Sequence, residues 1–174
     1  MKYAKSSRII HWLMAAIIFV ALATGIYMTD KELDVDFRQS IYNFHKSIGV
    51  VIFILIIYRI INRFINKPPK LPSSISPIEQ KLAKIGHFAL YLLMITTPIS
   101  GYLMSSYAGF NVIFFGIEIP NILSQGNLEI AQIFLEIHEV SAFSLLGVIV
   151  LHILGALKHR FYDKPENDVL NRII

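Results

Sequence analysis

Six histidines are the residues whose type and spacing suggest chemistry, and four of them lie in strongly apolar runs: His11, His87, His138 and His152. An ionisable side chain inside a membrane span is costly and marks a functional site by default. His138 and His152 are fourteen residues apart. On a helix this puts them about 40° apart around the axis and about 21 Å apart along it. One helix can therefore offer an imidazole to each of two sites at different depths.

The composition predicts that lipid surrounds these histidine-bearing segments. Of 174 residues, 55% are hydrophobic and only 16% are charged, with a mean hydropathy of +0.57. A single soluble domain of this length could not bury that much apolar surface in one core. The chain has no cysteine, which excludes disulfides, iron–sulfur clusters and c-type haem attachment.

Four apolar runs, at about residues 9–28, 41–65, 80–104 and 131–157, are long enough to position the histidines across a bilayer. About 20 apolar residues cross a hydrocarbon core of about 30 Å. Runs of this length satisfy their backbone groups in lipid as helices. The sequence therefore predicts an all-α integral membrane protein whose single domain, residues 1–174, is a bundle of four transmembrane helices.

The basic residues predict how the bundle is oriented. Four spans put residues 1–8, 66–79 and 158–174 on one side of the membrane. That side, with the adjoining helix ends, holds 13 of the 16 Lys and Arg residues, and the opposite side holds Lys31, Arg38 and Lys46. The positive-inside rule then places both termini in the cytoplasm. The high pI thus reflects membrane topology, and nucleic acid is not an expected partner.

Sorted by depth, the histidines form two groups. His45 and His138 lie near the outer surface, and His11, His87 and His152 lie near the inner one. Zinc takes three or four ligands at one point, and non-haem iron usually takes a carboxylate. Two axial imidazoles on one flat macrocycle are what a six-coordinate haem b requires. The expected pairs are His45 with His138 and His11 with His152.

Other readings of these histidines stay open at this point. A single histidine near the end of a span can be an ordinary hydrogen-bonded group. His87 can replace His11 as the inner ligand, bond a haem propionate or hold a quinone carbonyl. A non-redox membrane scaffold or small transporter with incidental histidines is the least favoured alternative.

The order of four segments resembles the bacterial cytochrome b561 family over almost the whole chain: HWLMAAIIFVALATGIYM, NFHKSIGV, KIGHFALYLLMITTPISGYLM and IHEVSAFSLLGVIVLHILGALKHR. This resemblance implies a multi-pass protein of the bacterial inner membrane that carries two b haems. It also implies the same ligands, His45 with His138 and His11 with His152. The compact chain is most similar to the stand-alone members, which oxidise superoxide outside the membrane and reduce ubiquinone.

The resemblance therefore implies a superoxide:quinone oxidoreductase. An anionic substrate is attracted by positive charge, and the possible superoxide patch consists of Lys46, Arg38 and Lys31. Lys46 follows His45 directly, which makes it the best placed of the three. The outer loops as a whole are acidic, which favours the alternative of a cytochrome b subunit that accepts electrons from a partner redox protein or dehydrogenase.

Overall fold

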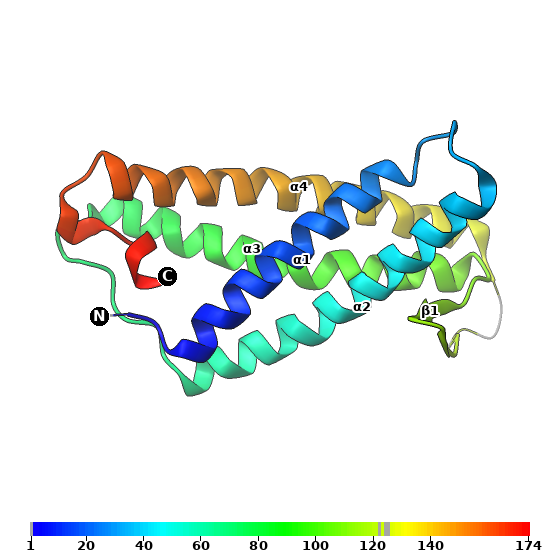
Figure 1. Cartoon of the computed structure of the whole chain (residues 1–174), viewed down its shortest axis with the longest axis horizontal. Helices are drawn as coiled ribbons and strands as arrows, with labels where there is room; N and C mark the ends of the chain where they lie inside the picture. Colours follow the sequence, from blue (N-terminus) through cyan, green and yellow to red (C-terminus); the bar gives the residue numbers. More distant parts are fainter. Residues whose placement is uncertain (1, 122, 124–125) are drawn as a thin grey trace.

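The computed structural model describes residues 2–121, 123 and 126–174. Its long elements are four helices, α1 (Lys5–Tyr27), α2 (Val35–Ile65), α3 (Pro77–Tyr107) and α4 (Leu128–Phe161). They run side by side along the molecule, and both termini lie at the same end (Figure 1). All four are long and apolar enough to cross a membrane. The chain is thus an all-α integral membrane protein, a bundle of four transmembrane helices.

All four helices begin earlier than hydropathy alone indicated, and in α2, α3 and α4 polar residues cap the first turn. The Asp34 side chain accepts hydrogen bonds from the backbone at the start of α2, and Asn127 does so at the start of α4. Ser76 and Glu79 form a reciprocal capping box on α3, with Pro77 at its first position. Such caps satisfy the free N–H groups of a helix start, so the helices extend beyond the hydrocarbon region.

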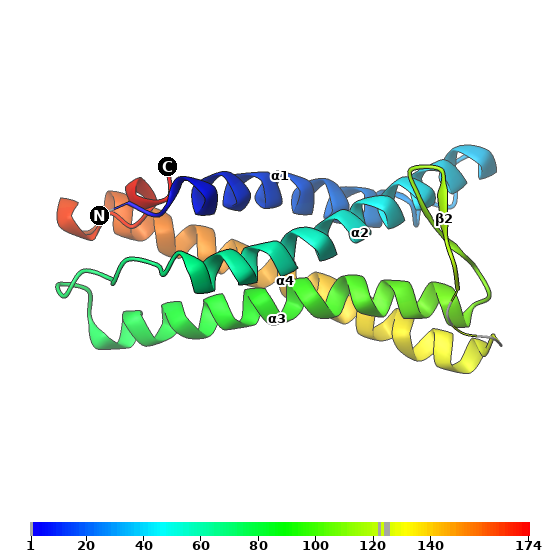
Figure 2. The ribbon, with the colours of Figure 1, turned by 90° about the horizontal axis from the view of Figure 1, so that it is seen from below.

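The helices pack in chain order, α1 on α2, α2 on α3 and α3 on α4. Figure 2 shows α1 and α3 on opposite sides of the bundle, with α2 between them. Buried apolar side chains from all four helices form a core at mid-length, made of Ile10, Met14, Ile18, Ile48, Ile52, Ile56, Met94 and Leu145. This apolar layer separates the two ends of the bundle, where the histidines lie.

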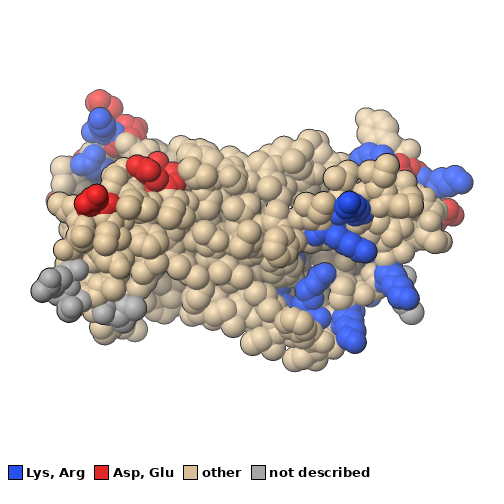
Figure 3. Space-filling view, turned by 180° about the vertical axis from the view of Figure 1, so that it is seen from behind, with Lys and Arg blue, Asp and Glu red and all other residues tan. Residues whose placement is uncertain are grey.

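The outward surface of the bundle is apolar as well. In the most hydrophobic window of each helix only 6% to 22% of the residues are buried inside the protein, so lipid must cover the rest. On the face that Figure 3 shows, the middle of the molecule carries no charged side chain, one end is strongly basic, and the opposite end has acidic and basic groups. The basic end carries both termini, and the positive-inside rule makes it cytoplasmic.

A small hairpin covers part of the outer end. Strands β1 (Val112–Phe114) and β2 (Ile117–Ile119) pair antiparallel and contact α2. The buried hydroxyl of Ser47 on α2 donates to the carbonyl of Ile113 at 2.9 Å and accepts from the Phe115 N–H at 3.0 Å. The hairpin is therefore fixed to α2 two residues after His45.

The C-terminal tail returns to α1 at the cytoplasmic end. It contains the short 3-10 helices η1 (Pro165–Asn167) and η2 (Leu170–Arg172). The indole N–H of Trp12 donates to the carbonyl of Ile173 at 3.1 Å, and Arg8 donates to that of Ile174. The tail thus lies against the first turns of α1, next to the inner histidines.

Candidate functional site

The structure brings the outer histidines together. His45 of α2 and His138 of α4 have ring centroids 6.1 Å apart and planes 83° apart. A bond from a first-row metal to imidazole is about 2 Å long and the ring centre lies about 1 Å further, so two axial imidazoles have centroids about 6 Å apart. The separation of this pair equals the span of two ligands on one iron.

Hydrogen bonds define the proton positions on the outer rings. Nδ1 of His138 lies 2.8 Å from the carbonyl oxygen of Thr97 on α3. A carbonyl only accepts, so Nδ1 carries the hydrogen and Nε2 keeps its lone pair. Nδ1 of His45 lies 3.2 Å from Oγ1 of Thr24 on α1, whose own hydrogen goes to the carbonyl of Val20 at 2.8 Å. The same tautomer follows for His45.

Three histidines and an arginine meet at the inner end. His11 of α1 and His152 of α4 have ring centroids 6.3 Å apart, and His87 of α3 lies 5.4 Å from His152. The first distance matches the span of about 6 Å between two axial ligands, whereas the second is shorter than that span by roughly half an ångström. Guanidinium Nη2 of Arg59 lies 3.0 Å from Nδ1 of His11. His11 with His152 is therefore the better matched inner pair, and His87 lies beside it.

Arg59 fixes a different tautomer on His11. A guanidinium has only donors, so Nδ1 of His11 accepts and the hydrogen of the neutral ring lies on Nε2. The Arg59 and Arg63 guanidinium carbons lie 5.7 and 5.6 Å from the ring centroid of Tyr91. Both arginines also line a cavity of about 40 Å³ with Asn62. In the part of the chain that the structure describes, neither has a carboxylate partner.

The three outer cations do not form a single cluster. The ammonium of Lys46 lies 5.7 Å from the ring centroid of Phe110, and its side chain is half-buried. Arg38 lies eight residues earlier on α2, which is about 12 Å along the axis, and Lys31 lies in the loop before that helix. Among the described residues no direct contact joins the three. Lys46 is the one beside His45.

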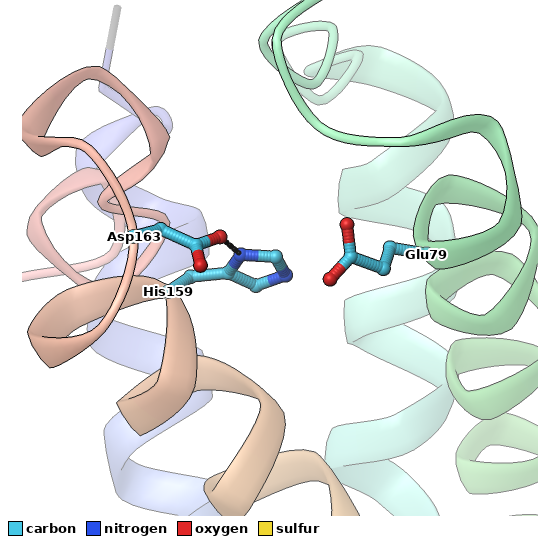
Figure 4. A group of neighbouring side chains, drawn as sticks. All are labelled: Glu79, His159 and Asp163. Atoms are coloured by element: carbon cyan, nitrogen blue, oxygen red, sulfur yellow. Dashed lines mark hydrogen bonds and ion pairs between the residues drawn. The ribbon is translucent and has the colours of Figure 1, made fainter.

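A second group of side chains of the kind that bind metal ions lies at the cytoplasmic end and consists of Glu79, His159 and Asp163. Its two carboxylates already form ion pairs with Lys158. Figure 4 shows His159 between Asp163 and Glu79, and Nδ1 of His159 lies 2.7 Å from Asp163. The ammonium of Lys158 lies 2.5 Å from Glu79 and 2.9 Å from Asp163. The positive charge that these carboxylates attract is therefore that of Lys158. We call this group the cytoplasmic clasp, because it ties the start of α3 to the end of α4.

A four-helix membrane bundle with facing histidine pairs at both ends is typical of a membrane cytochrome of the b type. The family model for prokaryotic cytochrome b561 matches residues 2–174. The chain belongs to the prokaryotic cytochrome b561 family, whose members bind haem b and transfer electrons in the bacterial inner membrane.

Two curated proteins are similar along most of their length. "Cytochrome b561 homolog 2" of Escherichia coli (strain K12) is 33% identical over 174 residues, covering 99% of this chain and 91% of that protein. "Probable superoxide oxidase CybB" of Yersinia pestis is 29% identical over 157 residues, covering 90% of this chain and 88% of that protein.

The histidines fit the group that the family binds. At the outer pair the separation of the ring centroids matches that of two axial ligands on one iron. Each ring also has a free lone pair on Nε2, the form in which neutral imidazole binds iron. At the inner pair the span is also right, but the hydrogen of His11 must move from Nε2 to Nδ1. Arg59 must then turn to another acceptor, and a carboxylate is the best acceptor for a guanidinium.

The sequence did not point to the residues that hold the rings. Arg59 was counted among the cytoplasmic cations, although a charge inside an apolar helix is itself a signal of function. Thr24 and Thr97 gave no signal, because the atoms that matter are a hydroxyl and a backbone carbonyl on a different helix from the histidine they bond.

Proposed function

We propose that this chain is a di-haem b electron-transfer protein in which His45 and His138 are the outer axial ligands and His11 and His152 the inner ones. The observation that carries the proposal is the pair of ring separations, 6.1 and 6.3 Å, at opposite ends of one bundle. When bound, haem with both axial positions filled supplies one-electron transfer and has no site for oxygen.

In this function the protein positions the axial ligands of both haems and separates the two haem sites by an apolar layer. Helix α4 supplies one ligand at each end through His138 and His152. Between them lies the apolar layer, in which Met14 and Ile56 are fully buried and Leu145 is 5% exposed. A dry layer of this kind excludes water and its protons, while electrons cross between groups at its two faces.

The proposed donor is superoxide on the outer side and the proposed acceptor is ubiquinone. Each superoxide loses one electron and becomes oxygen. Two such electrons and two protons reduce one quinone to the quinol, so charge and atoms balance. The half-buried ammonium of Lys46 beside His45 supports this proposal, because positive charge attracts the anion; Arg38 and Lys31 add to it at longer range. The name of the Yersinia relative agrees with this donor.

His87 is proposed to contact the inner haem or the quinone without being an iron ligand. Its ring centroid lies 5.4 Å from that of His152, so it lies at the edge of the inner site. From there a neutral imidazole can donate to a quinone carbonyl or to a propionate. A quinone there would lie on the cytoplasmic side of the apolar layer.

A partner redox protein is the second candidate for the donor. The loop before α2 and its first turn carry four carboxylates, Asp30, Glu32, Asp34 and Asp36, on the outer side. Acidic rims of this kind steer basic partners. In that case the chain is a cytochrome b subunit that receives electrons at the same outer haem.

The experiment is reduction of the purified, haem-loaded protein by a steady flux of superoxide, with ubiquinone present and absent. We expect the haem bands to be reduced at once, superoxide dismutase to abolish the reduction, and quinol to accumulate when ubiquinone is added. If the haems were reduced no faster under the superoxide flux than in a control that contains its dismutation products, hydrogen peroxide and oxygen, but no superoxide, superoxide would be ruled out as the donor. The di-haem assignment would then still stand on the haem content.

A further inference from the structure

Two glycines lie directly against the rings of the outer histidines. A Cβ built on Gly101 of α3 would lie 2.9 Å from both Nδ1 and Cε1 of His138, and one on Gly25 of α1 would lie 3.1 Å from Cε1 of His45. Non-bonded carbon atoms are most stable at about 3.5–4.0 Å. Each imidazole therefore occupies space that exists only because the neighbouring helix has no side chain at that point.

Each glycine is accompanied by the hydrogen-bond acceptor of the same ring. The carbonyl of Thr97 accepts from His138 at 2.8 Å, one helical turn before Gly101. The hydroxyl of Thr24 accepts from His45 at 3.2 Å, in the residue before Gly25. The glycine sets how closely the helix can approach the ring and the hydrogen bond sets how the ring is turned, so the two features act together on the ring.

The same arrangement occurs twice, on two helix pairs that share no residue. Helix α1 holds the histidine of α2, and α3 holds the histidine of α4. Neither of the inner rings, His11 and His152, lies within 4 Å of a Cβ built on any glycine among the described residues. The arrangement is therefore a property of the outer site.

We propose that Gly25 and Gly101, together with Thr24 and the backbone of Thr97, are positioning residues that fix the plane and the tautomer of the two outer haem ligands. The proposal rests on the di-haem function proposed above. A hydrogen bond from Nδ1–H makes Nε2 a stronger donor to the metal. This favours the oxidised haem and lowers the midpoint potential of the outer site.

The test compares three glycine-to-alanine variants in the haem-loaded protein, by electron paramagnetic resonance and potentiometric titration. Gly101→Ala is expected to change the g-anisotropy and raise the midpoint potential of the outer haem, and Gly25→Ala to do so less. Gly147→Ala is the matched control: no atom lies within 4 Å of its Cβ, and it is exposed on α4. All three gain the same intrinsic helix propensity. The inner haem should not change in any of them.

Thr24→Val tests the hydrogen bond without a change of shape. The valine keeps the branched side chain but cannot accept from His45, so the outer potential should rise, and Thr24→Ser should restore it. If Gly101→Ala loses the outer haem, retention of the inner haem shows that the bundle is folded and supports the proposal. Unchanged outer spectra and potential in both Gly101→Ala and Thr24→Val, with two haems present, would overturn it. A wild-type protein without haem would instead overturn the proposed function.

Discussion

Guanidinium Nη2 of Arg59 lies 3.0 Å from Nδ1 of His11. This contact puts a full positive charge beside one proposed inner ligand. The outer ligands bond only neutral groups of the neighbouring helices. Haem binding would turn Arg59 from Nδ1 of His11 to another acceptor, but its positive charge would stay beside the inner site, so the two proposed haems should differ in potential.

Arg59→Gln is expected to lower the midpoint potential of the inner haem. At an effective dielectric constant of about 20, a unit charge about 8 Å away contributes about 2 kcal/mol, or about 90 mV for one electron. The loss of a cation favours the oxidised form, so the shift is downward and largest at low salt. Potentiometric titration measures it. Arg160→Gln is the control, because Arg160 pairs with Asp168 of the C-terminal tail, and an equal shift there would contradict the assignment.

His87→Ala should leave two haems per chain, whereas His11→Ala should leave one. The reason is the spacing: 6.3 Å between the His11 and His152 rings suits an iron between them, and 5.4 Å between the His87 and His152 rings does not. The pyridine haemochrome assay gives the stoichiometry. If His87→Ala lost a haem and His11→Ala kept both, the inner ligands would be His87 and His152.

Lys46→Gln should slow the reduction of the protein by superoxide, by roughly several-fold and up to about tenfold. Lys46 is next in sequence to His45, and removing its charge reduces the attraction of the anion to the outer haem. Lys31→Gln, in the more distant loop, should have a smaller effect. The rate constant should also fall as salt is added. Equal rates for wild type and Lys46→Gln at low salt would mean that this lysine does not guide the donor.

The cytoplasmic clasp should weaken in acid. Hydrogen bonds from Lys158 and His159 hold the pKa of Asp163 below its ordinary value of 3.8. A carboxyl whose pKa is lower in the folded state contributes stability above its unfolded pKa and loses it as the pH falls through the folded value. Hydrogen exchange at the start of α3 and the end of α4 should therefore accelerate below about pH 4.

Asp163→Asn is the control for the clasp. This variant should exchange faster than wild type at neutral pH and should show a smaller acid-dependent step, because Glu79 remains and its carboxylate, bonded to Lys158 and Ser76, also takes up a proton in acid. If wild type and Asp163→Asn showed the same dependence on pH, Asp163 would not be the group that titrates.

The spacing of apolar runs and histidines predicted much of this molecule. Four long apolar runs require helices in lipid, and the distribution of basic residues orients them; the structure and the family confirm this fold. Depth alone grouped His45 with His138 at the outer end and His11 and His87 with His152 at the inner end, because one helix repeats its face between His138 and His152. The helices begin before the apolar runs, since hydropathy does not register polar caps such as Asp34 and Ser76.

What the sequence could not predict depends on contacts between helices. The fit of His138 against Gly101 depends on how α4 and α3 are rotated relative to each other. Gly25 and Gly101 have no pattern in common that separates them from the other helical glycines. The hairpin is fixed by the contacts of Ser47 on α2 with the backbone of Ile113 and Phe115, which no sequence pattern marks.

The most direct test of the central claim is a redox titration of the purified protein, followed at the Soret band, for wild type, His138→Ala and His152→Ala. Wild type should show two one-electron components of similar amplitude. His138→Ala should remove one of them and His152→Ala the other, since α4 supplies one ligand to each site. A single component in wild type, or the loss of the same component in both variants, would contradict the account.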